Sequence, residues 1–116
     1  MTGTAKPAQR VILEMGTGNA LRSGDYTRAA KRAVEDAIRH SYLPVFQSLD
    51  MDPAEMEVAL TLAAQAPEKI DLAAAAAVLP YGKVTAKAVK GGLNVADGNG
   101  GHVVIVNAAV EVRLRV

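Results

Sequence analysis

A glycine pair, Gly16 and Gly18, stands between an apolar run at residues 11–15 and the start of an amphipathic segment at Asp25. Backbone N–H groups of such a loop, together with the following helix N-terminus, favour a bound anion. Arg22 lies in the same stretch and supplies a counter-charge. No third glycine follows Gly18 at the dinucleotide spacing, and the Gly-Lys-Ser/Thr of a P-loop is absent. The segment therefore predicts either a turn with positive φ at both glycines or a cradle for a small anion.

Three more polar residues interrupt apolar segments. Glu14 sits in the first apolar run, where it is either a solvent-facing strand residue or a partner for Arg22 or a ligand amine. His102 follows a glycine-rich turn, which suits a general acid or base, and Asn107 is either a structural hydrogen-bonding centre or a site residue. No catalytic residue is identified. The candidate ligand-binding residues are Glu14, Gly16, Gly18, Arg22, His102 and Asn107.

Several classes of site and partner are not expected. The chain has no cysteine, which excludes disulfides and thiolate sites, and no spacing resembles a zinc or di-metal site. We expect neither a metal nor another cofactor. A net charge of +1 argues against nucleic acid, and no apolar run approaches the roughly 20 residues of a membrane span. The first ten residues lack the apolar stretch of a signal peptide, so we expect a cytoplasmic protein.

Hydrophobic periodicity predicts the elements that position these residues. An apolar run rich in β-forming residues predicts a strand at 11–15, and alternating patterns predict strands at 56–63, 83–89 and 102–116. A stripe of small apolar residues predicts a helix from Asp25, its N-cap, to about His40. Asp71 caps a second, alanine-rich helix over 72–79, and Pro80 ends it. Glycine-rich turns are expected at 91–92 and 97–101, and the segment 41–54 is expected to be irregular.

The element order β-α-β-α-β-β predicts a single α+β domain over residues 11–116, after a flexible tail at 1–10. We expect a mixed four-stranded sheet with two helices on one face. This order resembles the Bacillus chorismate mutase-like fold. The alternative, a ferredoxin-like domain, has the order β-α-β-β-α-β and fits less well. The resemblance implies trimers with sites between subunits.

The composition points to self-association. The chain has one Phe, three Tyr and no Trp, and its apolar residues are largely Ala and Val. A buried Ala side chain contributes about 0.8 kcal/mol, against roughly 1.5–3 kcal/mol for Val or Leu. A core this lean gains stability when subunits bury further surface, so we expect an oligomer, with three-fold symmetry as the first choice.

Blocks along almost the whole chain from Val11 onward resemble a family of conserved hypothetical proteins of bacteria and plants, named after a Listeria locus. Its members carry Gly-x-Gly-x-Asp-x-His-Gly after a strand, then an Ala-rich helix, and a final Asn-Ala-Ala-Val-Glu-Val strand. The matching residues here are Gly16, Gly18, Ala29-Ala30, Ala33-Val34, Asp36-Ala37-Ile38, Leu79-Pro80-Tyr81-Gly82, Gly91-Gly92-Leu93 and Asn107-Ala108-Ala109-Val110-Glu111-Val112.

The chain departs from that motif where the family has Asp, His and Gly: it has Ala20, Arg22 and Ser23. Asp and His would supply acid–base or metal-binding capability, whereas Arg22 stays protonated. The resemblance implies a subunit that completes inter-subunit sites for a small polar or anionic metabolite with an Asp/His-bearing paralogue. The alternative is a stand-alone hydrolytic, ring-opening or isomerising enzyme, so whether the chain is an enzyme stays open. As loop positions tolerate change, we expect Ala20→Asp with Arg22→His to leave the fold intact.

Overall fold

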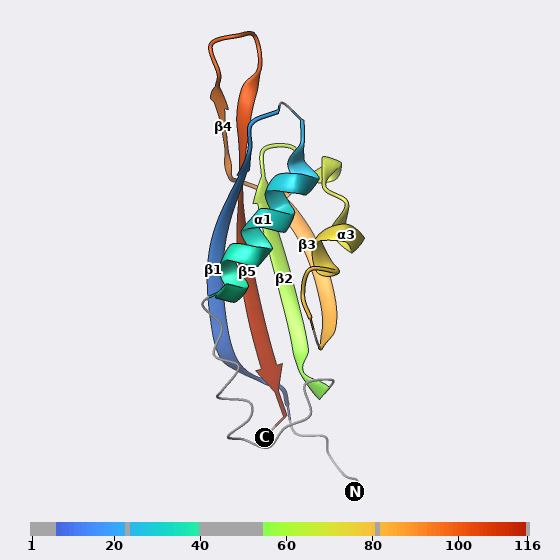
Figure 1. Ribbon diagram of the computed structural model, residues 1–116. Helices are drawn as coiled ribbons and strands as arrows, with labels where there is room; N and C mark the ends of the chain where they lie inside the picture. The colour runs from blue at the N-terminus through green and yellow to red at the C-terminus, as the bar shows by residue number, and fades with distance from the viewer. Residues whose placement is uncertain (1–6, 23, 40–54, 81, 116) are drawn as a thin grey trace, which may run out of the picture.

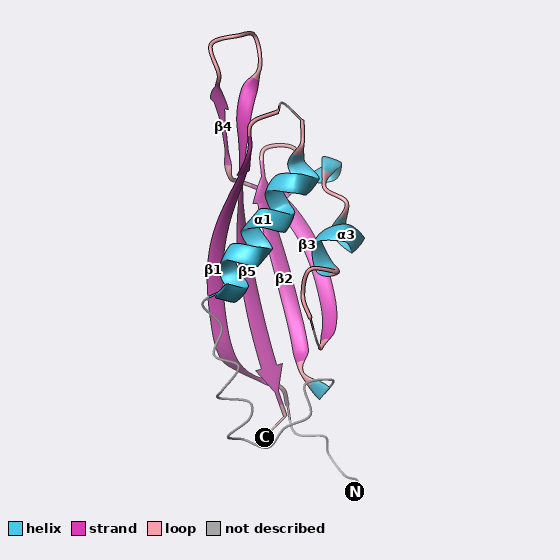
Figure 2. Cartoon of the chain, in the orientation of Figure 1, coloured by secondary structure: helices cyan, strands magenta, loops and turns pink. Residues whose placement is uncertain are grey.

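The computed structural model describes residues 7–22, 24–39, 55–80 and 82–115. They form two layers, a twisted sheet and a helical layer that covers one of its faces (Figure 1). Figure 2 shows the helices together on the same side of the strands. The elements in chain order are β1 (Gln9–Ala20), α1 (Tyr26–Arg39), β2 (Glu57–Ala64), the 3-10 turn η2 (Pro67–Lys69), α3 (Leu72–Ala76), β3 (Lys83–Lys90), β4 (Leu93–Ala96) and β5 (His102–Leu114).

The sheet is mixed and has the order β1-β5-β2-β3. The last strand, β5, lies between β1 and β2 and is antiparallel to both. β2 and β3 are parallel, and η2 with α3 makes the crossover between them. The predicted α+β class, with a mixed sheet and two helices on one face, is confirmed. The sheet has one strand more than expected, because β4 pairs with the beginning of β5.

The first strand is longer than predicted. It runs from Gln9 to Ala20 instead of ending at Met15, so Gly16 and Gly18 are strand residues. Neither has a positive φ; the described glycines that do are Gly24, Gly82, Gly92, Gly98 and Gly100. The prediction of a glycine loop with positive φ at Gly16 and Gly18 is therefore wrong. The strand also begins inside the segment expected to be a tail, of which residues 1–6 lie outside the described residues.

Packing explains why glycine stands at these two positions. A Cβ at Gly16 would overlap Ala33 O and Ala37 N, and one at Gly18 would overlap Ala29 O and Ala33 N. The backbone of α1 therefore lies directly against β1, with Ala29, Ala33 and Ala37 fully buried between them. Glycine here permits close approach of two backbones, whereas the sequence pattern indicated a turn.

The strand β4 was missed because it is four residues long and lies between two turn signals. Both turns are present: Gly92 has a φ of 61°, and the Asp97 carboxylate accepts from Asn99 N at 2.7 Å and Gly101 N at 3.1 Å. Too short to show periodicity, the segment becomes a strand by pairing with β5. The second helix is shorter than predicted and ends at Ala76, although Asp71 caps it as expected, accepting from Ala74 N at 3.1 Å.

The core lies between the helices and the covered face of the sheet. No buried residue of the described ranges is polar or charged. Its volume comes from aliphatic side chains, since Tyr26 is the sole aromatic residue among its buried members. The largest fully buried side chains are those of Met56, Leu60, Leu62, Leu114, Val34, Val104 and Val106. The lean core expected from composition is thus what the structure contains.

Candidate functional site

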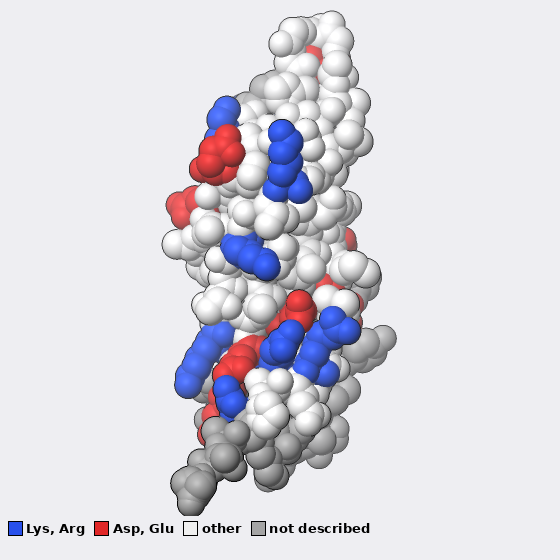
Figure 3. Space-filling model, turned by 180° about the vertical axis from the view of Figure 1, so that it is seen from behind, with Lys and Arg blue, Asp and Glu red and all other residues white. Residues whose placement is uncertain are grey.

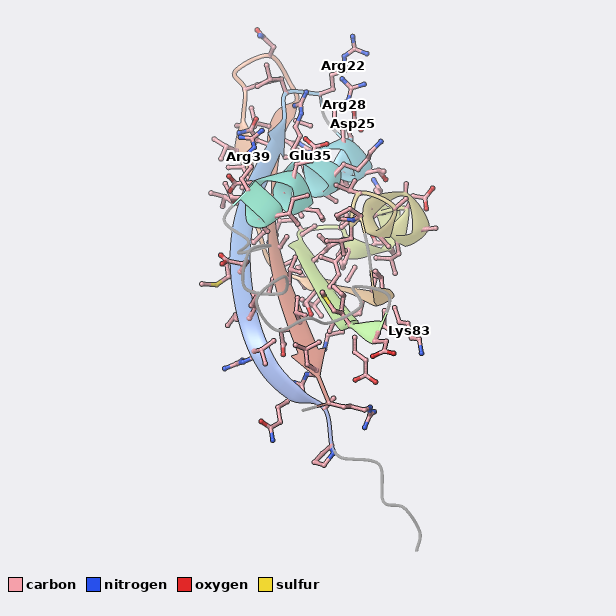
Figure 4. All side chains as sticks on the ribbon, turned by 60° about the horizontal axis from the view of Figure 1, so that its bottom comes forward. Arg22, Asp25, Arg28, Glu35, Arg39 and Lys83 are labelled. Carbon is pink, nitrogen blue, oxygen red and sulfur yellow. The ribbon has the colours of Figure 1, made fainter. Side chains whose placement is uncertain are left out.

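A pocket of about 190 Å³ opens where β1 ends and α1 begins. Figure 4 shows Arg22, Asp25 and Arg28 grouped at this end of α1, with Arg39 at the other end of the helix and Lys83 at the far end of the sheet. Three arginines and one carboxylate share the pocket. Its lining residues are Ala20, Leu21, Arg22, Asp25, Arg28 and Arg32.

Helical spacing brings the charged residues of α1 to one side. Residues 25, 28 and 32 are three and four positions apart, which places them on the same helix face. Asp25 is the N-cap, as predicted: its Oδ1 accepts from Arg28 N at 3.3 Å, and its Oδ2 lies 3.2 Å from Arg28 Nε. The carboxylate is thus engaged both by the helix end and by Arg28.

The close approach of α1 to β1 fixes the third arginine. Arg32 Nη1 donates to the carbonyl of Asn19 at 2.7 Å, and one turn further Asp36 Oδ2 accepts from Thr17 N at 2.9 Å. These side chains cover the outer edge of β1, where unpaired backbone groups would invite another strand. Because its guanidinium is hydrogen-bonded to the edge of β1, Arg32 reaches the pocket from a fixed position.

The pocket has more positive charge than the carboxylate within it balances. Among the described residues, none forms a hydrogen bond or ion pair with the Arg22 guanidinium. Arg32 binds a neutral carbonyl and Arg28 shares the Asp25 carboxylate. The positive surface continues along α1 into a second hollow of about 450 Å³, lined by Asp25, Thr27, Arg28, Lys31, Arg32 and Glu35. Guanidinium groups in such numbers suit a carboxylate or phosphate, which they bind bidentately.

The structure places the six predicted site residues in different parts of the molecule. Arg22 lines the pocket, while Gly16 and Gly18 face the α1 backbone, so they offer no open cradle. Glu14 is a half-buried residue of β1 paired with Val110. The expectation that these residues converge is therefore not met within one chain.

The other two predicted residues lie on β5 and do not line the pocket. His102 is its first residue and pairs with Ala96 of β4. Asn107 lies on the uncovered face of the sheet, where its Nδ2 donates to Thr17 Oγ1 at 2.9 Å. Thr17 in turn donates to the carbonyl of Val106 at 3.4 Å. The hydrogen bond to Thr17 favours a structural role for Asn107 over a role as a site residue.

Sequence analysis did not assign Arg28 and Arg32 to a site. Their spacing from Asp25 carried the signal, because three residues on one face at a helix start converge on the preceding loop. Ala20 was taken as a loop residue, but it is the last residue of β1 and is 1% exposed. The two positions at which the chain departs from the Asp/His motif, 20 and 22, nevertheless line one pocket.

The described ranges contain neither a metal-binding cluster nor a membrane-spanning helix. No three His, Cys, Asp or Glu side chains there lie close enough to hold a metal ion. No helix within the same ranges has the length and apolar character needed to cross a bilayer.

Comparisons with known proteins agree with the fold. Residues 10–112 match a family of conserved hypothetical proteins, the Lin0512 family. No curated protein matches the chain. A similar solved structure is that of an FtsZ-like protein of unknown function from Nostoc punctiforme, with 32% sequence identity and a TM-score of 0.84, covering 96% of this chain and 99% of that one. The chain therefore belongs to the Lin0512 family of conserved hypothetical proteins.

Proposed function

We propose that this chain is a subunit of a small oligomer and binds a small anionic metabolite in the pocket at the start of α1. One observation carries the proposal: Arg22, Arg28 and Arg32 line a single pocket that contains one carboxylate, Asp25. Asp25 is already engaged as the helix cap and by Arg28. A ligand with one or two carboxylate or phosphate groups would complement the remaining charge.

The family motif supports the same pocket as the ligand site. Positions 20 and 22, where relatives have Asp and His, both line it. In this chain they are Ala20 and Arg22, which supply neither a general base nor a metal ligand at neutral pH. We therefore propose binding without chemistry by this chain alone. A paralogue that carries Asp and His in the same segment would supply the reactive groups in a mixed assembly.

A melting experiment tests the anion pocket. Inorganic phosphate or pyrophosphate at one hundred times its Kd would stabilise the protein by about 2.7 kcal/mol. The shift should be present in wild type and absent in Arg22→Ala. Arg39→Ala is the matched control, because it removes the same charge from the other end of α1 (Figure 4). Equal shifts in wild type, Arg22→Ala and Arg39→Ala would exclude this pocket.

The role of a paralogue is tested by turnover. Each chain is assayed separately and then mixed, and native mass spectrometry of the purified protein with its genomic neighbours reports partner, stoichiometry and ligand together. The proposal predicts an inactive chain that gains activity in the mixture. Robust turnover by this chain alone would instead support the stand-alone enzyme. Sedimentation resolves an oligomer from the 12.1 kDa monomer, and it distinguishes the three copies implied by the chorismate mutase-like resemblance from other copy numbers.

A further inference from the structure

The face of the sheet away from the helices carries exposed apolar side chains on several strands. Met15 of β1 is 68% exposed and Leu93 of β4 is 54% exposed. The other large exposed apolar residues of this face are Val11, Leu13, Val89 and Val95. Figure 3 shows the molecule from behind: charged side chains of both signs are densest over its lower part, and others lie over its middle and upper part. Exposed apolar patches of this kind mark interaction surfaces.

The strands of this face carry exposed side chains of different sizes. Leu13 and Met15 are large apolar side chains on β1, and we call this pair the ridge. On β2 and β3 the small side chains of Ala59, Thr61 and Thr85 line two adjoining hollows of about 300 and 220 Å³, which we call the groove. Longer charged side chains line the same hollows, namely those of Glu57, Lys83, Lys87 and Arg113. The pairing register puts Leu13 in one row with Glu111, Ala59 and Thr85, and Met15 in the next row with Ala109, Thr61 and Lys87.

We infer that a second copy of this chain packs against this face, with the ridge of each copy in the groove of the other. A two-fold axis that runs parallel to β5, between the two facing sheets, places β1 of one copy opposite β2 of the other. Each row of residues then faces the same row of the partner. The axis therefore places Leu13 over Ala59 and Met15 over Thr61 of the partner, in both directions at once. A surface that carries both halves of a contact in matching rows is what an isologous dimer requires.

The dimensions and charges of the face fit this occupant. Four strands about 4.8 Å apart, and a central strand about 40 Å long, give an area of roughly 800 Å², which is the usual size per partner of a stable interface. At the charged end, Arg113 pairs with Glu111 at 3.1 Å and Arg115 with Glu57 at 3.0 Å. Charges that are already paired can approach their two-fold copies without leaving one sign unbalanced.

This inference is independent of the anion pocket, which lies on the helical side of the molecule. A reciprocal contact has two-fold symmetry, so it predicts an even number of copies, whereas the fold resemblance favours three. Loss of the pyrophosphate shift with an intact dimer would count against the pocket alone. Loss of the dimer with an intact shift would count against the interface alone.

Sedimentation velocity at micromolar concentration tests the interface by charge exchange. Wild type should sediment as a dimer, at twice 12.1 kDa. Met15→Glu, which puts a carboxylate on the ridge, and Thr61→Lys, which puts an ammonium in the groove, should each be monomeric at the same concentration. An equimolar mixture of the two variants should recover dimers, because the introduced charges meet across the interface.

Two controls keep the result interpretable. Ala73→Glu adds the same charge on α3, on the helical side, and should leave the dimer intact. Circular dichroism melts should show that both interface variants are folded, as expected for positions on the uncovered face of the sheet. A monomeric wild type, a trimer, a dimer that survives Met15→Glu, or a mixture that stays monomeric would overturn the inference.

Discussion

The two faces of the sheet differ in how closely their neighbours approach. On the covered face, α1 lies so near β1 that Gly16 and Gly18 have no room for a Cβ. On the open face, Met15, one residue before that glycine pair, is 68% exposed. The same strand thus meets a backbone on one side and solvent on the other. Close packing on one side sets the position of Arg32, and with it the pocket, while apolar side chains such as Met15 stay exposed on the open side.

The largest effect should come from a charge on the covered face. Val34 is fully buried in α1, so Val34→Asp leaves an unpaired carboxylate in the core and should cost about 3–5 kcal/mol, a large part of the total stability of a small domain. Urea unfolding measures this cost. Lys31→Asp, at an exposed position of the same helix, should stay within about 0.5 kcal/mol of wild type. Similar midpoints for the two variants would mean that α1 is not docked as described.

Substitutions at two neighbouring residues of β1 should differ in their cost to stability, because one residue faces α1 and the other lies on the open face. Gly18→Ala forces α1 away from β1 and should cost about 3 kcal/mol, because the atoms in the way belong to the backbone. Thr17→Ala, on the open face, removes two hydrogen bonds and should cost about 1 kcal/mol. Denaturant titrations of both variants give the comparison. If Gly18→Ala were as stable as wild type, the close contact would have to be absent.

The motif positions lie at the end of β1 and just after it, and they should respond unequally to substitution. Ala20 is 1% exposed, whereas Arg22 is exposed. Ala20→Asp should therefore cost about 2 kcal/mol through desolvation of its carboxylate, and Arg22→His about 0.5 kcal/mol or less. Thermal melts of the single and double variants check this. Unchanged melting of Ala20→Asp would restore the expectation that position 20 tolerates change like a loop.

The smallest difference in stability is expected between substitutions of two asparagines on opposite faces of the sheet, Asn94 and Asn107. Asn94 donates to Tyr26 Oη at 2.9 Å, and its buried Oδ1 has no partner among the described residues. Asn94→Ala leaves the buried hydroxyl unpaired and should cost about 1–2 kcal/mol. Asn107→Ala removes an exposed bond to Thr17 and should cost about 0.5 kcal/mol. The reverse order, measured by urea unfolding, would make Asn107 more than a surface residue.

Much of the architecture was predictable from local pattern. The alternation in β2, β3 and β5 and the apolar stripe of α1 gave these elements to within one or two residues, because a half-buried strand and a half-buried helix each leave a fixed period in the sequence. Asp25 and Asp71 marked helix starts because a carboxylate satisfies free N–H groups there. The spacing of Asp25, Arg28 and Arg32 also indicates that they share one helix face. These three residues make up half of the pocket lining, but the sequence analysis did not assign them to a site.

Tertiary structure decided the rest, since the same residue types serve different purposes in different surroundings. A glycine pair after a strand reads as a turn, and only the backbone of α1 above it shows that Gly16 and Gly18 are there for close approach. The four residues of β4 have no pattern of their own and become a strand by pairing with β5. Period alone tells which residues share a face of a sheet. Which face the helices cover, and so which face stays open, follows from long-range packing that no local pattern records.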